Sequence, residues 1–393
     1  RTITVSSAPD ALLESVRRLA PVVEAEREAL DRRRELTPRL VAALVGAGLF
    51  RLWAPRALGG AELEPVAGLE VLAALSELDG SVGWNAMIAS AYTFFAGRLP
   101  ERAAKAIFGR RGAIVAGQLE PGGEAVPVRG GYRVTGRWPF GSGSKQATWF
   151  LAHCVVRAPR PARPRRGAAP PRPEVRLVFV PAARCRIHDT WRVSGLRGTG
   201  SHDYSMRGVP VPADYSVDVI ADQPTRPEPL YAFPVIPFVT MAVAAVPIGI
   251  ARAAIAAFVE LARTKRSAGS TQPLREHPAA QRELGRATLH LRSAEALLFQ
   301  VVEDVWATVK GGKPPTLEQR AEVRTACVNA GLGAARAVDT VYELAGSAAI
   351  FERGRLERCF RDVHAATQHV SLAPRTLEVV GRVRFGMEPH GLL

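Results

Sequence analysis

Apolar residues recur three and four positions apart along residues 1–112, as in the segments SVRRLAPVVEAEREAL and LTPRLVAALVGAGLF. This spacing places them on one face of an α-helix. Thr37 and Pro38 suit the N-cap and the first turn of such a helix, and Gly46 and Gly48 suit its exit. We therefore predict a helical N-terminal domain over these residues.

The pattern changes over residues 113–220, where short runs rich in β-branched and aromatic residues alternate with glycine and proline. The runs are GAIVAG, GYRVTGRWPF, TWFLAHCVV, EVRLVFV and YSMRGVPV. Runs of this length and composition are typical of β-strands. Their spacing predicts a small antiparallel barrel or sandwich in the middle of the chain.

Helical periodicity returns over residues 221–393, with a loop at 310–315 and a break at Pro374. The apolar run 231–261 is long enough to suggest a membrane span, but prolines and Arg252 interrupt it and small alanines fill its second half. We interpret it as a buried helix and expect no membrane association. The order helix, strand, helix indicates an α+β, mostly helical chain of three domains.

The net charge of +15 raises the question of nucleic-acid binding. The excess is local, because a cluster of arginines falls within residues 157–176, a proline-rich run that cannot bury a core. We interpret this run as a solvated loop between two strands, with an anion or nucleic-acid contact as the alternative. Since no groove-reading motif accompanies it, we expect no nucleic-acid partner.

The four cysteines, Cys154, Cys185, Cys327 and Cys359, form no CxxC pair. They are too far apart in sequence to indicate a metal cluster or a disulfide framework, so we expect no metal site. Charged residues near the start of the sequence argue against a secretion signal. These observations favour a reducing cytoplasm.

Four segments resemble the acyl-CoA dehydrogenase superfamily, and together they extend over nearly the whole chain. They are AGLFRLWAPRALGGAE followed by SELDGSVGW, GGYRVTGRWPFGSGSKQATWFLA, WRVSGLRGTGSHDYSMRGVPVP and GRLERCFRDVHAATQHVSLAP. The second segment is similar to the stretch that lies beside the flavin ring in that family, and the fourth to the active-site end of the last long helix. The resemblance implies an N-terminal helical domain, a middle antiparallel β-barrel and a C-terminal four-helix bundle.

The resemblance also implies where a dehydrogenase would carry its base. In most members a glutamate follows an Arg-Asp pair, here Arg361 and Asp362, and Val370 stands about where it would be. The family's other position falls within residues 243–252, which contain no acid. A dehydrogenase needs a carboxylate to remove a proton while the flavin accepts a hydride, and both expected places lack one.

His369 instead resembles a residue of the two-component flavin-dependent monooxygenases, such as the oxygenase components of hydroxyphenylacetate hydroxylase and dibenzothiophene monooxygenase. In these relatives a C-terminal histidine and a serine of the middle domain hold a flavin C4a-hydroperoxide, and the matching serine is Ser142. Such an adduct persists only where its protons are held and water is excluded. Taken from the residues alone, His369 could also be a core histidine and Ser142 an ordinary turn residue.

No GxGxxG or Walker motif indicates a nicotinamide or ATP fold. The resemblance places FMN or FAD between the middle domain and the bundle, with help from a neighbouring subunit. Its implied contacts are Phe140 and Ser142 at the ring, Gln118 near it, Arg266 on the phosphate, and Thr199 and Ser201 as further hydroxyl contacts. A solvated basic helix end is the alternative for Arg266.

We expect the substrate pocket at Trp84, Asn85, Met87, Ala91 and Phe94 and at the bundle, with core packing as the alternative. The resulting prediction is an oxygenase component that takes reduced flavin from a separate reductase and uses O2 to oxygenate an aromatic, polyketide-like, sulfur or amine substrate. The alternatives are an acyl-CoA dehydrogenase with its base displaced to Glu343 or Glu352, and a non-enzymatic helical scaffold. The family resemblance implies a homotetramer.

Overall fold

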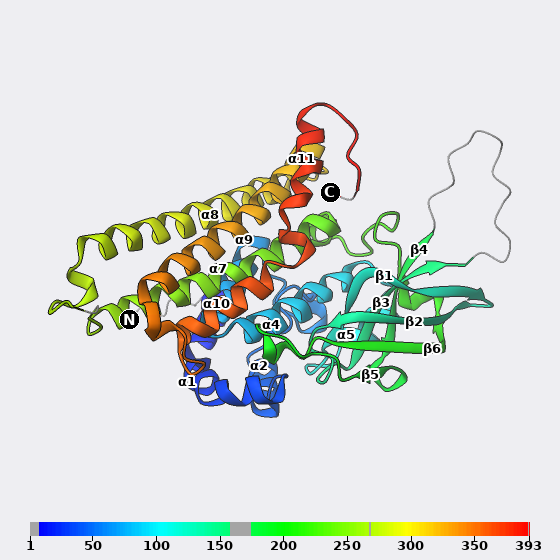
Figure 1. The fold of residues 1–393 in the computed structure, drawn as a ribbon. Helices are drawn as coiled ribbons and strands as arrows, with labels where there is room; N and C mark the ends of the chain where they lie inside the picture. Colours follow the sequence, from blue (N-terminus) through cyan, green and yellow to red (C-terminus); the bar gives the residue numbers. More distant parts are fainter. Residues whose placement is uncertain (1–7, 158–173, 267–268, 392) are drawn as a thin grey trace, which may run out of the picture.

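The computed structural model describes residues 8–157, 174–266, 269–391 and 393. Its elements follow the predicted order of helices, strands and helices (Figure 1). The helices are α1 Ala8–Arg33, α2 Pro38–Gly46, α3 Pro65–Leu78, α4 Gly80–Thr93, α5 Glu101–Phe108, α6 Pro229–Ala232, α7 Val235–Ala262, α8 Pro278–Lys310, α9 Leu317–Ala345, α10 Arg355–Ala366 and α11 Leu377–Arg384. The strands are β1 Val115–Val128, β2 Gly131–Gly141, β3 Trp149–Val156, β4 Val175–Pro181, β5 Arg186–His188, β6 His202–Pro212 and β7 Ser216–Val217. Two short turns used below are η4 Arg197–Thr199 and η8 Val370–Leu372.

The predicted start and stop signals of α2 are confirmed. Thr37 is the N-cap, and its hydroxyl accepts a hydrogen bond from the Leu40 N–H at 3.3 Å. The helix ends at Gly46, and Gly48 adopts φ +75°, a left-handed conformation that glycine reaches without steric cost. The chain can therefore turn sharply between α2 and the segment that leads to α3.

Asp79 fixes the start of α4. Its Oδ1 accepts hydrogen bonds from the N–H groups of Ser81 and Val82, at 2.9 and 3.2 Å. These are two of the N–H groups that a helix leaves without an intrahelical partner. Because every residue of α4 is buried, the cap sets the position of a helix that lies inside the protein, between the sheet and the C-terminal helices (Figure 1).

The strands form one seven-stranded sheet in the order β5-β6-β2-β1-β3-β4-β7. The neighbouring pairs are antiparallel except β1 and β3, which are parallel. The prediction of an antiparallel middle domain was therefore wrong for this pair. The reason is that the chain leaving β2 crosses the end of β1 and joins its far edge, and residues 142–148 can span two strand spacings of about 4.8 Å each.

Two apolar cores organise the described residues. The larger core joins the N-terminal helices to the C-terminal ones, so α3 and α4 pack directly on α7. The smaller core lies within the sheet, where Tyr204 stacks on Trp138 and Phe150 at centroid distances of 5.4 and 4.5 Å. The predicted N-terminal and C-terminal helical regions thus share one core, and the β region has its own.

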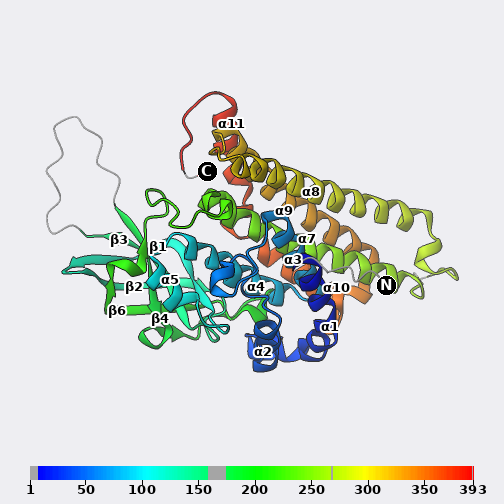
Figure 2. The ribbon, with the colours of Figure 1, turned by 180° about the vertical axis from the view of Figure 1, so that it is seen from behind.

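The long apolar helix α7 is enclosed by other helices. Its length and composition would suffice to cross a membrane, but 72% of its apolar window is buried inside the protein. It packs against α3, α9 and α10 (Figures 1 and 2). The prediction of a buried helix is confirmed.

The arginine-rich run follows β3, which ends at Val156, and extends into β4, which begins at Val175. Its two ends make ion pairs at the surface: Arg157 Nε lies 2.9 Å from Glu124, and Arg176 Nε lies 3.1 Å from Glu174. The remaining arginines of the run fall within residues 158–173, outside the described residues.

Candidate active site

Three hydroxyl groups meet where α4, the turn after β2 and the η4 turn come together. Ser142 Oγ lies 2.8 Å from Ser201 Oγ, which lies 2.6 Å from Thr199 Oγ1. All three side chains are buried. We call Ser142, Thr199 and Ser201 the hydroxyl cluster. The structure thus brings together three residues that the sequence assigned to the cofactor.

Trp84 connects the hydroxyl cluster to His369. Its indole Nε1–H donates a hydrogen bond to Ser142 Oγ at 3.0 Å. Its ring packs edge-on against the imidazole of His369, with centroids 5.7 Å apart and an interplanar angle of 69°. Ser142 and His369 therefore contact the same tryptophan, although they are far apart in the sequence.

His369 is held as a neutral imidazole. It follows α10 and is the N-cap of η8, where its Nδ1 accepts a hydrogen bond from the Ser371 N–H at 3.2 Å. This bond assigns the ring proton to Nε2. Burial, with a smaller effect of the positive charge of Arg324, lowers the pKa of His369 to about 4. At neutral pH the ring therefore offers an N–H donor at Nε2.

The 194–201 loop holds the hydroxyl cluster against two helices. The Leu196 N–H donates to Asp362 Oδ1 of α10 at 2.6 Å, and the Gly198 N–H donates to Ser81 Oγ of α4 at 3.1 Å. Leu196 has φ +52°, a conformation that costs a non-glycine residue roughly 1–3 kcal/mol and persists only where its surroundings enforce it. The bond to Asp362 is one such constraint.

A buried ion cluster lies behind this loop. Arg358 Nε lies 2.8 Å from Asp79 Oδ2 and its Nη1 lies 3.1 Å from Asp31 Oδ1, while Asp362 Oδ2 is 3.9 Å from Nε. Burial raises the pKa of Asp362 to about 7, and the charge of Arg358 opposes that rise. In the sequence, Asp362 served only to mark where the missing base would follow. The i,i+4 spacing of Arg358 and Asp362 was the signal for an ion pair.

Phe140 stands at the open edge of the hydroxyl cluster. Its side chain is 59% exposed, and its backbone has φ +57°. The ring of Trp191 lies edge-on to it, with centroids 6.3 Å apart. A strained backbone that holds a large apolar side chain open to solvent provides a face that a planar ring can cover. The residues therefore fit a flavin, with an aromatic face beside buried hydroxyl groups.

Gln118 lies on β1 at the irregularity in its pairing with β3. Its Oε1 accepts hydrogen bonds from the N–H groups of Leu119 and Glu120 at 2.8 and 3.4 Å. The amide NH2 group is thereby left as the donor that Gln118 can present to a ligand.

The residues expected in the substrate pocket occupy different environments. Asn85 supports the turn after β2, since its Oδ1 accepts from Gln146 Nε2 at 2.8 Å and its Nδ2 donates to the Gly198 carbonyl at 3.3 Å. Three others have no accessible surface: Met87, Ala91 and Phe94. Phe94 stacks on Phe238 at 4.1 Å. Trp84 is the member of the set that contacts the hydroxyl cluster.

The places where a dehydrogenase base was sought contain no carboxylate near His369. Val370 is 52% exposed. Glu352 precedes α10 whereas His369 follows it, and a helix of this length separates its ends by about 18 Å. Glu343 lies in the last turn of α9, and both glutamates are exposed. Neither is placed to act beside the hydroxyl cluster.

Arg266 is not part of this arrangement. It is exposed and follows the end of α7, which runs away from the sheet (Figure 1). A helix of that length spans about 42 Å. Within one chain, Arg266 is therefore remote from the hydroxyl cluster.

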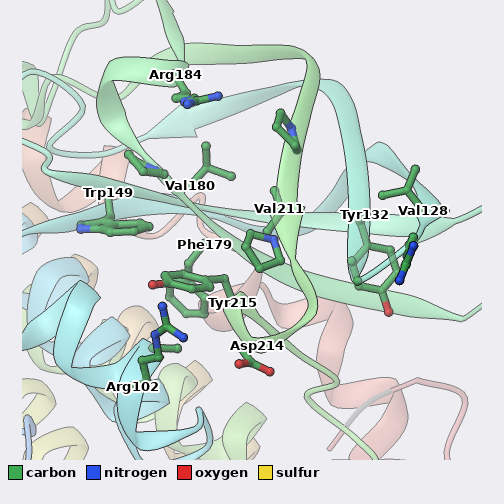
Figure 3. Close-up of a pocket in the computed structure, with 17 residues that line it drawn as sticks. Arg102, Val128, Tyr132, Trp149, Phe179, Val180, Arg184, Val211, Asp214 and Tyr215 are labelled. Atoms are coloured by element: carbon green, nitrogen blue, oxygen red, sulfur yellow. The ribbon is translucent and has the colours of Figure 1, made fainter.

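A separate cavity of about 600 Å³ lies between α5 and the sheet (Figure 3). Arg102 and Arg184 border it, and the ring of Trp149 stacks on that of Tyr215 beside it, with centroids 5.7 Å apart. None of the hydroxyl cluster residues lines this cavity. It is distinct from the site around Ser142.

Sequence comparisons identify the proteins that the chain resembles. Residues 241–374 match the family described as "Acyl-CoA dehydrogenase, C-terminal domain". The chain is 31% identical to the indole-3-acetate monooxygenase of Pseudomonas putida, over 97% of this chain and 94% of that protein.

Two solved structures share the fold along their whole length. The HsaA monooxygenase of Mycobacterium tuberculosis is 26% identical, with a TM-score of 0.87 over 98% of this chain and 99% of that one. XiaF from Streptomyces sp., solved with FADH2 and glycerol, is 26% identical, with a TM-score of 0.89 over 97% and 96% of the two chains. On its similarity over nearly its whole length, the chain belongs to the flavin-dependent monooxygenases built on the acyl-CoA dehydrogenase fold.

Proposed function

We propose that the chain is the oxygenase component of a two-component system that hydroxylates a small aromatic compound. The observation that supports this most strongly is the pairing of a buried hydroxyl cluster with a neutral His369 around Trp84. The two positions where the family's dehydrogenases carry their base, residues 243–252 and Val370, hold no acid. An aromatic substrate is supported by the indole-3-acetate monooxygenase to which the chain is similar.

Reduced FMN or FAD, delivered by a separate reductase, supplies the two electrons with which O2 is activated. One oxygen atom enters the substrate and the other leaves as water. Ser142 would hold the flavin ring by a hydrogen bond at N5, and His369 would donate its Nε2 proton toward oxygen or the substrate. Trp84, which contacts both side chains, would keep them in place and exclude water.

The remaining cofactor contacts come from two subunits in this proposal. Phe140 covers the flavin ring and Gln118 donates to its edge. Arg266 binds the phosphate of a flavin held by a neighbouring copy, because in its own chain it is remote from Ser142. A homotetramer provides such contacts, and a cytoplasmic location suits its four free cysteines.

The proposal is tested by coupling, the fraction of reduced flavin whose oxidation yields hydroxylated product rather than hydrogen peroxide. Purified protein is mixed with reduced flavin, O2 and a panel of indoles and phenols. We expect Ser142→Ala and His369→Ala to lower coupling by roughly tenfold or more, since one positioned proton donor or acceptor contributes on the order of 10²-fold.

His364 provides a matched control. It lies on α10, and its Nε2 is paired with Asp339 at 2.7 Å, away from Trp84. His364→Ala should leave coupling unchanged. Full coupling in both site variants would remove Ser142 and His369 from the proposed mechanism.

A further inference from the structure

We propose that Thr199 and Ser201 fix the direction of the Ser142 hydroxyl, so that Ser142 offers the flavin a hydrogen-bond acceptor and the site selects reduced over oxidised flavin. The inference rests on the proposed function. It concerns residues that act through Ser142 and are therefore positioning residues.

The hydroxyl cluster forms a chain whose far end is a backbone carbonyl. Thr199 Oγ1–H donates to the Leu196 carbonyl oxygen at 2.9 Å. A hydroxyl has one proton, so the 2.6 Å contact between Thr199 and Ser201 must be bridged by the proton of Ser201. The 2.8 Å contact between Ser201 and Ser142 is then bridged by the proton of Ser142.

In this arrangement Ser142 has no proton left for a ligand. Its O–H donates to Ser201 Oγ, and its oxygen accepts from the Trp84 Nε1–H. One lone pair of that oxygen is left. If the direction of donation were reversed, Thr199 would donate to Ser201 and Ser201 to Ser142. Thr199 would then lose its hydrogen bond to the Leu196 carbonyl, and the buried proton of Ser142 would have no partner in the cluster. The first arrangement makes one more hydrogen bond, and an unmade bond in a buried site is costly.

An acceptor at this position distinguishes the two redox states of a flavin. N5 carries a hydrogen in the reduced ring and can donate it, whereas N5 of the oxidised ring is only an acceptor. With oxidised flavin bound, the free lone pair of Ser142 Oγ would face the lone pair of N5, which is unfavourable. The alternative is that Ser142 turns its proton toward N5 and loses its hydrogen bond to Ser201. The hydroxyl cluster therefore favours the form that a reductase delivers and weakens binding of the form that must leave.

The test is the ratio of the dissociation constants of oxidised and reduced flavin, measured by anaerobic titration. Ser201→Ala removes the acceptor for the Ser142 proton, and Thr199→Val removes the acceptor for the Ser201 proton. We expect each to lower the ratio by roughly tenfold, the effect of one hydrogen bond.

The midpoint potential of bound flavin provides a second measurement. Tighter binding of the reduced form raises this potential, so each variant should lower it by about 30 mV.

Two further variants make the outcome decisive. Ser144 lies in the same turn, is 2% exposed and donates to the Gly200 carbonyl at 2.8 Å, outside the chain of hydroxyls. Ser144→Ala should keep the ratio, and so should Thr199→Ser, which retains the hydroxyl. If Ser201→Ala does not fold, Thr199→Val, which keeps the shape of the side chain, gives the same answer.

Failure of this inference differs from failure of the proposed function. Wild-type protein that binds neither form of flavin overturns the proposed function and the inference with it. Two other results would overturn only the role of the hydroxyl cluster. One is that Ser201→Ala and Thr199→Val bind flavin with the same ratio of dissociation constants as wild type. The other is that Ser144→Ala lowers this ratio as much as they do.

Discussion

At the scale of single residues, the site depends on protons whose positions are set by neighbours. The backbone N–H of Ser371 assigns the proton of His369 to Nε2, and burial keeps that ring neutral. The resemblance to known enzymes predicted Ser142 and His369 from local sequence. It could not predict that Trp84 joins them, because the side chains meet only after three distant segments have packed together.

The lowered pKa of His369 predicts a pH dependence of stability. Its folded value is about 4, below its ordinary value of 6.5, so the unfolded chain binds a proton first as the pH falls. The stabilisation is full above pH 6.5 and is lost between pH 6.5 and 4. Urea unfolding of wild type and His369→Gln should show a difference in unfolding free energy that shrinks by roughly 3 kcal/mol over this interval. A difference that stays constant with pH would show that folding does not lower the pKa of His369.

At the scale of elements, the 194–201 loop joins the helix that leads to His369 with the turn that carries Ser142. Asp362 holds Leu196 in its left-handed conformation, and a β-carbon at Gly195 would overlap the Arg361 carbonyl oxygen. The sequence predicted strands on both sides of this loop. It could not predict the loop's path, since the Asp362 bond joins residues 166 positions apart.

Two substitutions at Asp362 separate its hydrogen bond from its charge. Asn keeps an oxygen that can accept from the Leu196 N–H, while Ala leaves that buried N–H without a partner, at a cost of about 1–3 kcal/mol. Hydrogen exchange should therefore speed up in residues 194–201 of Asp362→Ala and much less in Asp362→Asn, with β3 as the internal reference. Equal protection of the loop in Asp362→Ala and wild type would contradict the anchoring role.

At the scale of the whole molecule, the order of helices, strands and helices could be predicted from the sequence because periodicity is a local property. Two global features could not be predicted in this way. The parallel pairing of β1 with β3 depends on which edge of β1 the chain reaches after β2. The shared core of α3, α4 and α7 depends on contacts between the two ends of the chain. Both features place Ser142 beside α4.

The most direct test of the central claim follows the oxygen atom. The protein is supplied with reduced flavin, an aromatic substrate that it converts, and isotopically labelled dioxygen in unlabelled water, and the product is analysed by mass spectrometry. A monooxygenase with the site described here places one labelled atom in each product molecule. Oxygenated product without label would contradict the account. Substrate oxidised without gain of oxygen, in a parallel sample given oxidised flavin and no O2, would favour dehydrogenase chemistry.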